Sequence, residues 1–258
     1  MLRLARQQGY TPDPRLVLRA DPRRMSALAA TRYLLRIRTN TVLIIAGACG
    51  YFFLSGVQTF GMEFVTKQYH LSQFLAGLLM FFIGAGGVGG VLVAGRVLVS
   101  AVAAGATVLA FIPAILTHSP LAALPYVVVA AFCLGAQNPP IDAARLDIVP
   151  PLLWGRAEGV RSMLRTAAQA VAPTLFGVCS EYVFRGGSVP TARSLQWTFV
   201  VMLLPLAANA VVLLRAARSY PRDVVTAAAS AESQRSQVPP RRSLVPAPAE
   251  PVARPAER

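Results

Sequence analysis

The chain has 258 residues, of which 55% are hydrophobic and only 14% are charged, and its mean hydropathy is +0.52. This composition excludes an ordinary water-soluble domain, because too few polar side chains remain to cover a water-facing surface. The net charge of +14 is high enough for a nucleic-acid-binding protein, but most basic residues lie in the two ends of the chain, outside the apolar stretches. We therefore expect a protein of the cell (plasma) membrane, with the lipid bilayer as a partner and no nucleic acid.

Residues 1–40 form a basic segment with nine Arg and two Asp. From Arg23 to Arg38, apolar side chains alternate with arginines, which suits a helix lying on the cytoplasmic lipid surface. A solvated basic linker is the other interpretation of the same pattern.

Residues 41–218 contain the apolar stretches that predict the fold. A hydrocarbon core about 30 Å thick needs roughly 20 apolar residues per helix, and six stretches have that length. They are Thr41 to Phe60, Leu71 to Ala94, Val97 to Leu116, Leu121 to Asp142, Met163 to Val183 and Leu195 to Leu214. The sequence therefore predicts an all-α membrane protein with six transmembrane helices.

The distribution of basic residues predicts the orientation of these helices. With six spans, 22 of the 25 basic residues fall in the two tails and in the connections after the second and fourth spans. By the positive-inside rule, both termini lie in the cytoplasm. The tail, residues 219–258, is rich in Pro, Ala, Ser and Arg and has no periodic apolar face, so we expect it to be disordered.

Familiar chemical motifs give no sign of an enzyme. Residues 84–89 satisfy G-x-G-x-x-G, but they lie in an apolar span with no acid until Asp142, so we interpret these glycines as a helix-packing stripe that continues through Gly90 to Gly95. The three cysteines lie in apolar runs without a CxxC pair or a nearby His. We expect no catalytic residues, no metal and no cofactor.

Four side-chain amides within the spans are candidates for solute binding. An unpaired amide at membrane depth is costly, so each should face another helix or a water-filled cavity. The candidate substrate-binding residues are Gln58, Gln137, Asn138 and Gln169.

The end of the fourth span is a candidate gate. Pro139 and Pro140 interrupt the backbone hydrogen bonds there, and Asp142, Arg145 and Asp147 follow. A helix end that reaches water would show the same residues, because the interface relieves most of the cost of a charge.

A pair of charges also follows the first span. Glu63 and Lys67 are four residues apart, the spacing of an ion pair on a helix. We expect a surface ion pair there, with a proton-carrying carboxylate as the alternative.

The connection from Asp142 to Gly159, DAARLDIVPPLLWGRAEG, resembles the loop between helices ten and eleven of major facilitator superfamily transporters. The resemblance extends over about residues 33–218 and implies the C-terminal six-helix half of such a bundle, in a bacterial member of unassigned substrate. Arg156 lies in the matching Gly-Arg-Ala part of this loop and is a fourth gating candidate.

Two departures from the family accompany this resemblance. The basic loop between helices eight and nine is reduced here to Gly95-Arg96-Val97, and no N-terminal half is present in the sequence. In this superfamily the solute lies between two halves that rock against each other. A missing N-terminal half, a second copy or another partner half would complete the pathway.

Two functions from different classes follow. The first is transport of a small solute by alternating access, as a half-transporter or as a fragment of a twelve-helix secondary carrier, with a proton gradient as one coupling source. The alternative is a non-transporting membrane protein, either a truncated remnant or a helix-packing interaction partner. An intramembrane enzyme is disfavoured, because Glu63, Asp142 and Glu181 lie toward opposite ends of their spans.

Overall fold

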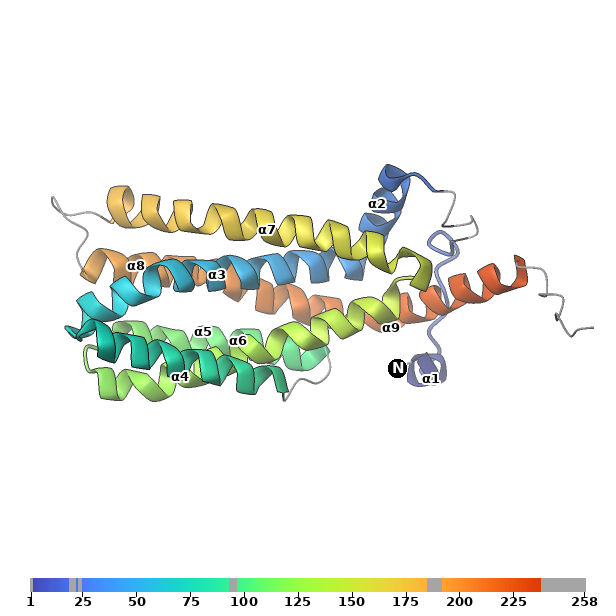
Figure 1. The fold of residues 1–258 in the computed structure, drawn as a ribbon. Coiled ribbons are helices and arrows are strands. Elements are labelled where there is room, and N and C mark those ends of the chain that lie inside the picture. Colours follow the sequence, from blue (N-terminus) through green and yellow to red (C-terminus); the bar gives the residue numbers. More distant parts are fainter. Residues whose placement is uncertain (1, 19–21, 23–24, 93–96, 185–191, 238–258) are drawn as a thin grey trace, which may run out of the picture.

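The computed structural model describes residues 2–18, 22, 25–92, 97–184 and 192–237, and every regular element in these ranges is helical (Figure 1). In chain order the elements are α1 (Leu2–Gln7), α2 (Ala27–Arg36), α3 (Arg38–Tyr69), α4 (Gln73–Leu92), α5 (Val97–Leu116), α6 (Pro120–Ile148), a 3₁₀ turn (Pro151–Leu153), α7 (Trp154–Val178), a π turn (Cys179–Val183), α8 (Ala192–Met202) and α9 (Leu204–Gln237).

Long helices run side by side along the bundle (Figure 1). Five of the described helices are long and apolar enough to cross a membrane: α3, α4, α5, α6 and the joined α8–α9. The remaining predicted span, Met163 to Val183, lies in α7 and the π turn. Because Arg161 and Arg165 belong to α7, this helix is less apolar, yet it packs along α3. The chain is therefore an all-α, multi-pass membrane protein.

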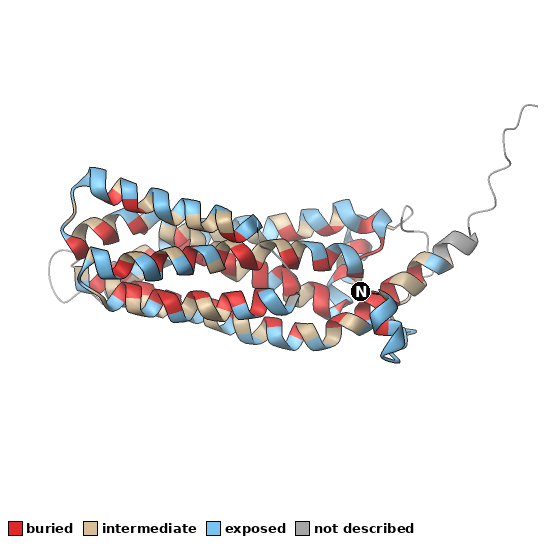
Figure 2. Cartoon of the chain, turned by 90° about the horizontal axis from the view of Figure 1, so that it is seen from below, coloured by how far each residue is buried: buried red, intermediate tan, exposed pale blue. Residues whose placement is uncertain are grey.

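The bundle has a buried interior and an exposed outer face along each long helix (Figure 2), and large apolar side chains occupy both. Large apolar side chains such as Phe74, Leu109 and Met163 are more than 70% exposed, while Thr107 and Gln137 are fully buried. A hydrocarbon solvent accepts the exposed side chains without cost, so the outer surface suits lipid.

Most helix boundaries agree with the predicted spans. Helix α5 coincides with its predicted span, Val97 to Leu116. Helix α3 is longer than predicted and ends at Tyr69, followed by His70 in the left-handed conformation (φ 53°). The extra turns hold Glu63 and Lys67, whose Oε1 and Nζ atoms are 2.7 Å apart, so the predicted ion pair is confirmed.

The predicted glycine stripe brings α4 and α6 into close contact. A Cβ atom on Gly90 would collide with the carbonyl oxygen of Phe132, and one on Gly135 would collide with the carbonyl oxygen of Gly87. No side chain fits at these positions, so two backbones approach each other directly. The helix-packing interpretation is confirmed for these glycines.

The chain after Ser219 differs from the sequence prediction. Instead of a disordered tail, residues 219–237 continue α9, and residues 238–258 lie outside the described part. Tyr220 and Val224 are buried in the core, and Ser230 accepts a hydrogen bond from the backbone N–H of Leu18 at 3.0 Å. The N-terminal segment thus packs against this part of α9. The composition of the tail alone does not predict such a contact.

Candidate functional site

A cavity of about 980 Å³ lies between α3, α4 and α6, and Phe111 of α5 is also among its lining residues. Its polar lining comes from Tyr51 and Gln58 of α3 and from Asn138 and Asp142 of α6. Most of the remaining lining is aliphatic, aromatic or glycine. A large apolar cavity with a few convergent polar groups is the usual form of a small-molecule site.

The structure separates the four amide candidates. Gln58 and Asn138 line the cavity, whereas Gln137 and Gln169 are not among its lining residues. The backbone carbonyl of Gln169 accepts a hydrogen bond from the Ser55 hydroxyl at 3.0 Å, which links α7 to α3.

Gln137 is fully buried and points toward α3. A Cβ atom on Gly50 would lie 2.7 Å from Gln137 Nε2, so the amide occupies the space that this glycine leaves open. Neither polar atom of the Gln137 side chain has a hydrogen-bond partner. A buried amide without partners costs about 1–3 kcal/mol, so the position has a structural cost.

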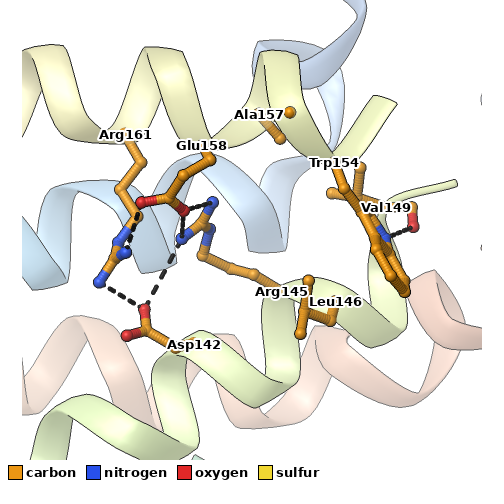
Figure 3. Close-up of a pocket in the computed structure, with 9 residues that line it drawn as sticks. Asp142, Arg145, Leu146, Val149, Trp154, Ala157, Glu158 and Arg161 are labelled. Atoms are coloured by element: carbon orange, nitrogen blue, oxygen red, sulfur yellow. Dashed lines mark hydrogen bonds and ion pairs between the residues drawn. The ribbon is translucent and has the colours of Figure 1, made fainter. Parts of the chain in front are cut away.

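Two of the gating candidates belong to a cluster of four charges at the end of the bundle where α6 ends and α7 begins (Figure 3). Arg161 pairs with Asp142, with 2.5 Å between Nη2 and Oδ1, and with Glu158, with 2.9 Å between Nη1 and Oε1. Arg145 lies 3.3 Å from Glu158 and 3.6 Å from Asp142. The cluster lines a second cavity of about 440 Å³.

The two arginines of this cluster are buried, and the two acids are half exposed. The side chains of Arg145 and Arg161 are 6% and 11% exposed, against 42% for Asp142 and 51% for Glu158. Removing either acid would leave a buried guanidinium short of a partner, which costs more than the loss of an exposed pair. The cluster therefore joins α6 firmly to α7.

The other two gating candidates lie apart from the charge cluster. Asp147 accepts a hydrogen bond from the Tyr220 hydroxyl at 2.6 Å, and Arg156 donates to the backbone carbonyls of Met25 at 2.8 Å and Pro22 at 3.4 Å. These contacts attach α9 and the N-terminal segment to the α6–α7 connection.

Sequence reasoning missed Glu158 and Arg161 as members of the cluster. Glu158 lies in the loop motif, and Arg161 lies just beyond it. In the sequence, Arg161 served only as one of the basic residues that predict the orientation of the helices. Their spacing of three residues places them on one face of a helix, which is the signal that could have found them.

Arg165 stands one turn beyond Arg161 in α7. Its Cζ atom lies 4.7 Å from the centroid of the Tyr51 ring, and its Nε atom is buried without a hydrogen-bond partner. A cation–π contact contributes roughly 0.5–2 kcal/mol.

Comparison with known proteins supports the fold. No family model matches the sequence, and no curated protein matches it. Among solved structures, the chain is similar to a bacterial homolog of the human lysosomal transporter Spinster, crystallised in an inward-facing and occupied conformation. The TM-score is 0.59 and the identity 19%, over 72% of this chain and 50% of that one.

The chain thus spans about half the length of that transporter. The matched fold, the apolar helices and the exposed hydrophobic surface agree with one another. The protein is an all-α, multi-pass membrane protein whose fold is similar to that of about half of this transporter.

Proposed function

We propose that this chain moves a small solute across the membrane by alternating access, as one half of a twelve-helix secondary carrier. The observation that carries the proposal is the cavity between α3, α4 and α6, which is apolar over most of its surface and polar at Gln58 and Asn138. A lipid-facing helix bundle that only packs has no need for such a lining.

The chain's own six helices supply one wall of this pathway. The half-length match leaves room for a second wall, which an N-terminal half, a second copy of this chain or another partner half would supply. The loop from Asp142 to Gly159 supports the C-terminal half as the part present here. The excess of basic residues in the tails and in the connections after the second and fourth spans supports cytoplasmic termini.

We assign solute contact to Gln58 and Asn138, which line the cavity. Gln137 and Gln169 act behind this wall, at the contacts that α3 makes with α6 and with α7. Their effect on the solute is therefore indirect.

We assign gating to the end of the bundle that holds the charge cluster. Asp142 and Arg145 couple α6 to α7 together with Glu158 and Arg161. Asp147 and Arg156 then couple this end to α9 and the N-terminal segment. Rigid-body rocking requires such couplings, because helix ends that moved separately would not transmit the motion.

Uptake of a solute panel into vesicles that contain the purified chain, with and without an imposed proton gradient, tests the proposal. Accumulation above empty vesicles that is lost in Asn138→Leu, and kept in the lipid-facing Leu109→Ala control, supports a carrier. Accumulation that depends on the gradient identifies the proton as the coupling ion. No uptake of any solute, alone or with a co-expressed partner half, favours the non-transporting membrane protein.

A further inference from the structure

Helix α2 joins the basic N-terminal segment to the first long helix and has two different faces. Ala30 and Leu34 are fully buried and belong to the core of the bundle. On the opposite side, Leu28 and Leu35 are 82% and 46% exposed. Arg32 lies between these two leucines, because residues four and three positions apart share one face of a helix. The exposed face of α2 therefore combines apolar and basic side chains.

The arginines on and beside this face have no counter-ion. Arg32 and Arg36 of α2 and Arg38, the first residue of α3, are all exposed, and none of them forms an ion pair with a described residue. The buried arginines of the charge cluster differ, since Arg145 and Arg161 each lie within 4 Å of a carboxylate. The three charges at α2 are therefore open to a partner outside the chain.

The position of α2 places its exposed face at the level of the lipid headgroups. Helix α2 lies at the end of the bundle where α7 begins, and its axis runs across the long helices (Figure 1). The extended residue Ile37 (φ −71°, ψ 101°) makes the corner between α2 and α3. The apolar run of α3 starts soon after this corner, at Thr41. An amphipathic helix just outside the hydrocarbon core lies in the plane of the interface.

A tryptophan at the start of α7 marks the same level. Trp154 is 42% exposed, and its Nε1–H donates a hydrogen bond to the backbone carbonyl of Val149 at 2.9 Å. Exposed tryptophans with a satisfied N–H are typical of the boundary between lipid and water. Two residues later, Arg156 donates to the backbone carbonyls of Met25 and Pro22, directly before α2. These contacts hold the start of α2 at the level of Trp154.

We propose that the exposed face of α2 binds anionic phospholipids of the adjoining leaflet. Arg32, Arg36 and Arg38 hold the lipid phosphates, and Leu28 and Leu35 enter the region just below the headgroups. A guanidinium fits a phosphate with two hydrogen bonds. Its charge favours a lipid with a net negative charge by roughly fivefold for each basic residue near the surface. The inference depends on insertion of the bundle into a membrane and not on transport.

Two other roles for α2 make different predictions. A helix surrounded by water would stay away from lipid in every bilayer. A helix held by Leu28 and Leu35 alone would contact neutral and anionic bilayers equally. A comparison of the two kinds of bilayer separates all three roles.

The test uses the full chain with its native cysteines replaced and an environment-sensitive fluorophore on Ala29→Cys, an exposed position that borders this face. The chain is placed in nanodiscs of phosphatidylcholine and of an equimolar mixture with phosphatidylglycerol. Both contain a trace of lipid with a nitroxide just below the headgroup. We expect stronger quenching in the mixture, and high salt should reduce the difference because salt screens exposed charges.

Substitution of the three arginines identifies the groups that recognise the lipid. The combined variant Arg32→Gln, Arg36→Gln and Arg38→Gln should lose the difference between the two bilayers, and the matching lysine variant should keep most of it. Short-chain phosphatidylglycerol, titrated into the chain in neutral micelles, gives the affinity. We expect it to bind at least about tenfold more tightly than short-chain phosphatidylcholine, and the glutamine variant should bind both lipids equally.

A control with the same change in net charge combines Arg3→Gln, Arg6→Gln and Arg15→Gln. These exposed arginines lie in the segment that packs against α9, and the control should leave the lipid preference unchanged. Absence of quenching in both bilayers, equal quenching in both, or an equal loss in the control would overturn the proposal. Uptake is a separate readout: lipid preference without uptake keeps this inference and rejects the carrier, whereas uptake without lipid preference does the reverse.

Discussion

The carboxylate of Asp223 accepts a hydrogen bond from the backbone N–H of Thr39 at 3.2 Å, so a residue of α9 caps the first turn of α3. The N-cap residue itself, Ile37, has no side chain that can accept this bond. The Thr39 and Ser219 hydroxyl oxygens add a second link, 2.6 Å apart. The start of the first long helix thus depends on the last one.

We predict that Asp223→Ala lowers the free energy of unfolding by about 1–2 kcal/mol, because the first turn of α3 loses both a buried acceptor and a negative charge at its positive end. Asp223→Asn keeps an acceptor and should cost less. Denaturation in detergent micelles, followed by circular dichroism, measures both. The control is Glu232→Ala, which removes an exposed ion pair with Arg6, and an equal loss in the control would contradict the cap's importance.

We predict different reactivities for two adjacent cysteine variants, made after the native cysteines are replaced. Asn138→Cys should react with a small aqueous thiol reagent, because position 138 lines the cavity, whereas Gln137→Cys should be protected by Gly50 and α3. Mass spectrometry of labelled protein in vesicles measures the two rates. Protection of position 138 in every transport state would refute the cavity assignment.

We predict that the pair Asp142–Arg161 is coupled more strongly than a surface pair. A double-mutant cycle with Asp142→Asn and Arg161→Gln should give a coupling energy of about 1–3 kcal/mol, because Arg161 is almost fully buried. The matched cycle on Arg6 and Glu232, whose side chains are 52% and 65% exposed, should give only about 0.2–1 kcal/mol. Unfolding of the variants in mixed micelles measures both coupling energies. Similar values for the two pairs would contradict a firm link between α6 and α7.

We predict opposite effects of the same substitution at two glycines of α4. Gly90→Ala should destabilise the protein by about 1–3 kcal/mol, because the new methyl group meets the backbone of α6. Gly77 has open space around it, and Gly77→Ala should stabilise the helix by up to about 1 kcal/mol. Thermal unfolding of both variants compares the two sites. A neutral Gly90→Ala would show that α4 shifts freely along α6.

Apolar length and glycine spacing predicted the apolar part of each long helix, because a bilayer imposes both. Helix α5 follows its apolar run to the residue, and Gly90 meets α6 as its spacing indicates. Residues 219–233 were missed because their polar positions are satisfied from the N-terminal segment. The hydroxyl of Thr226, for example, accepts a hydrogen bond from the backbone N–H of Asp13 at 3.0 Å. Such distant partners leave no local pattern in the chain.

The candidate site was harder to predict. The type of a residue indicates what its burial costs, but it does not show toward which neighbour the side chain points. Gln137 and Asn138 are neighbours with the same chemistry, yet consecutive helix positions point about 100° apart and only Asn138 reaches the cavity. The charge cluster was equally hidden, because only the structure shows that Arg161 pairs with both Asp142 and Glu158.

The combined length of the last two helices has a mechanical consequence. Helices α8 and α9, joined at Leu203, include the 42-residue span Ala192–Ser233, which corresponds to about 63 Å, roughly twice the thickness of the hydrocarbon core. About half of it must therefore stand outside the membrane, where Arg6 of the N-terminal segment meets Glu232. A change in tilt of the bundle would sweep this projecting end through an arc, so a fluorophore near Ser233 would report rocking as a change in its distance from the lipid surface.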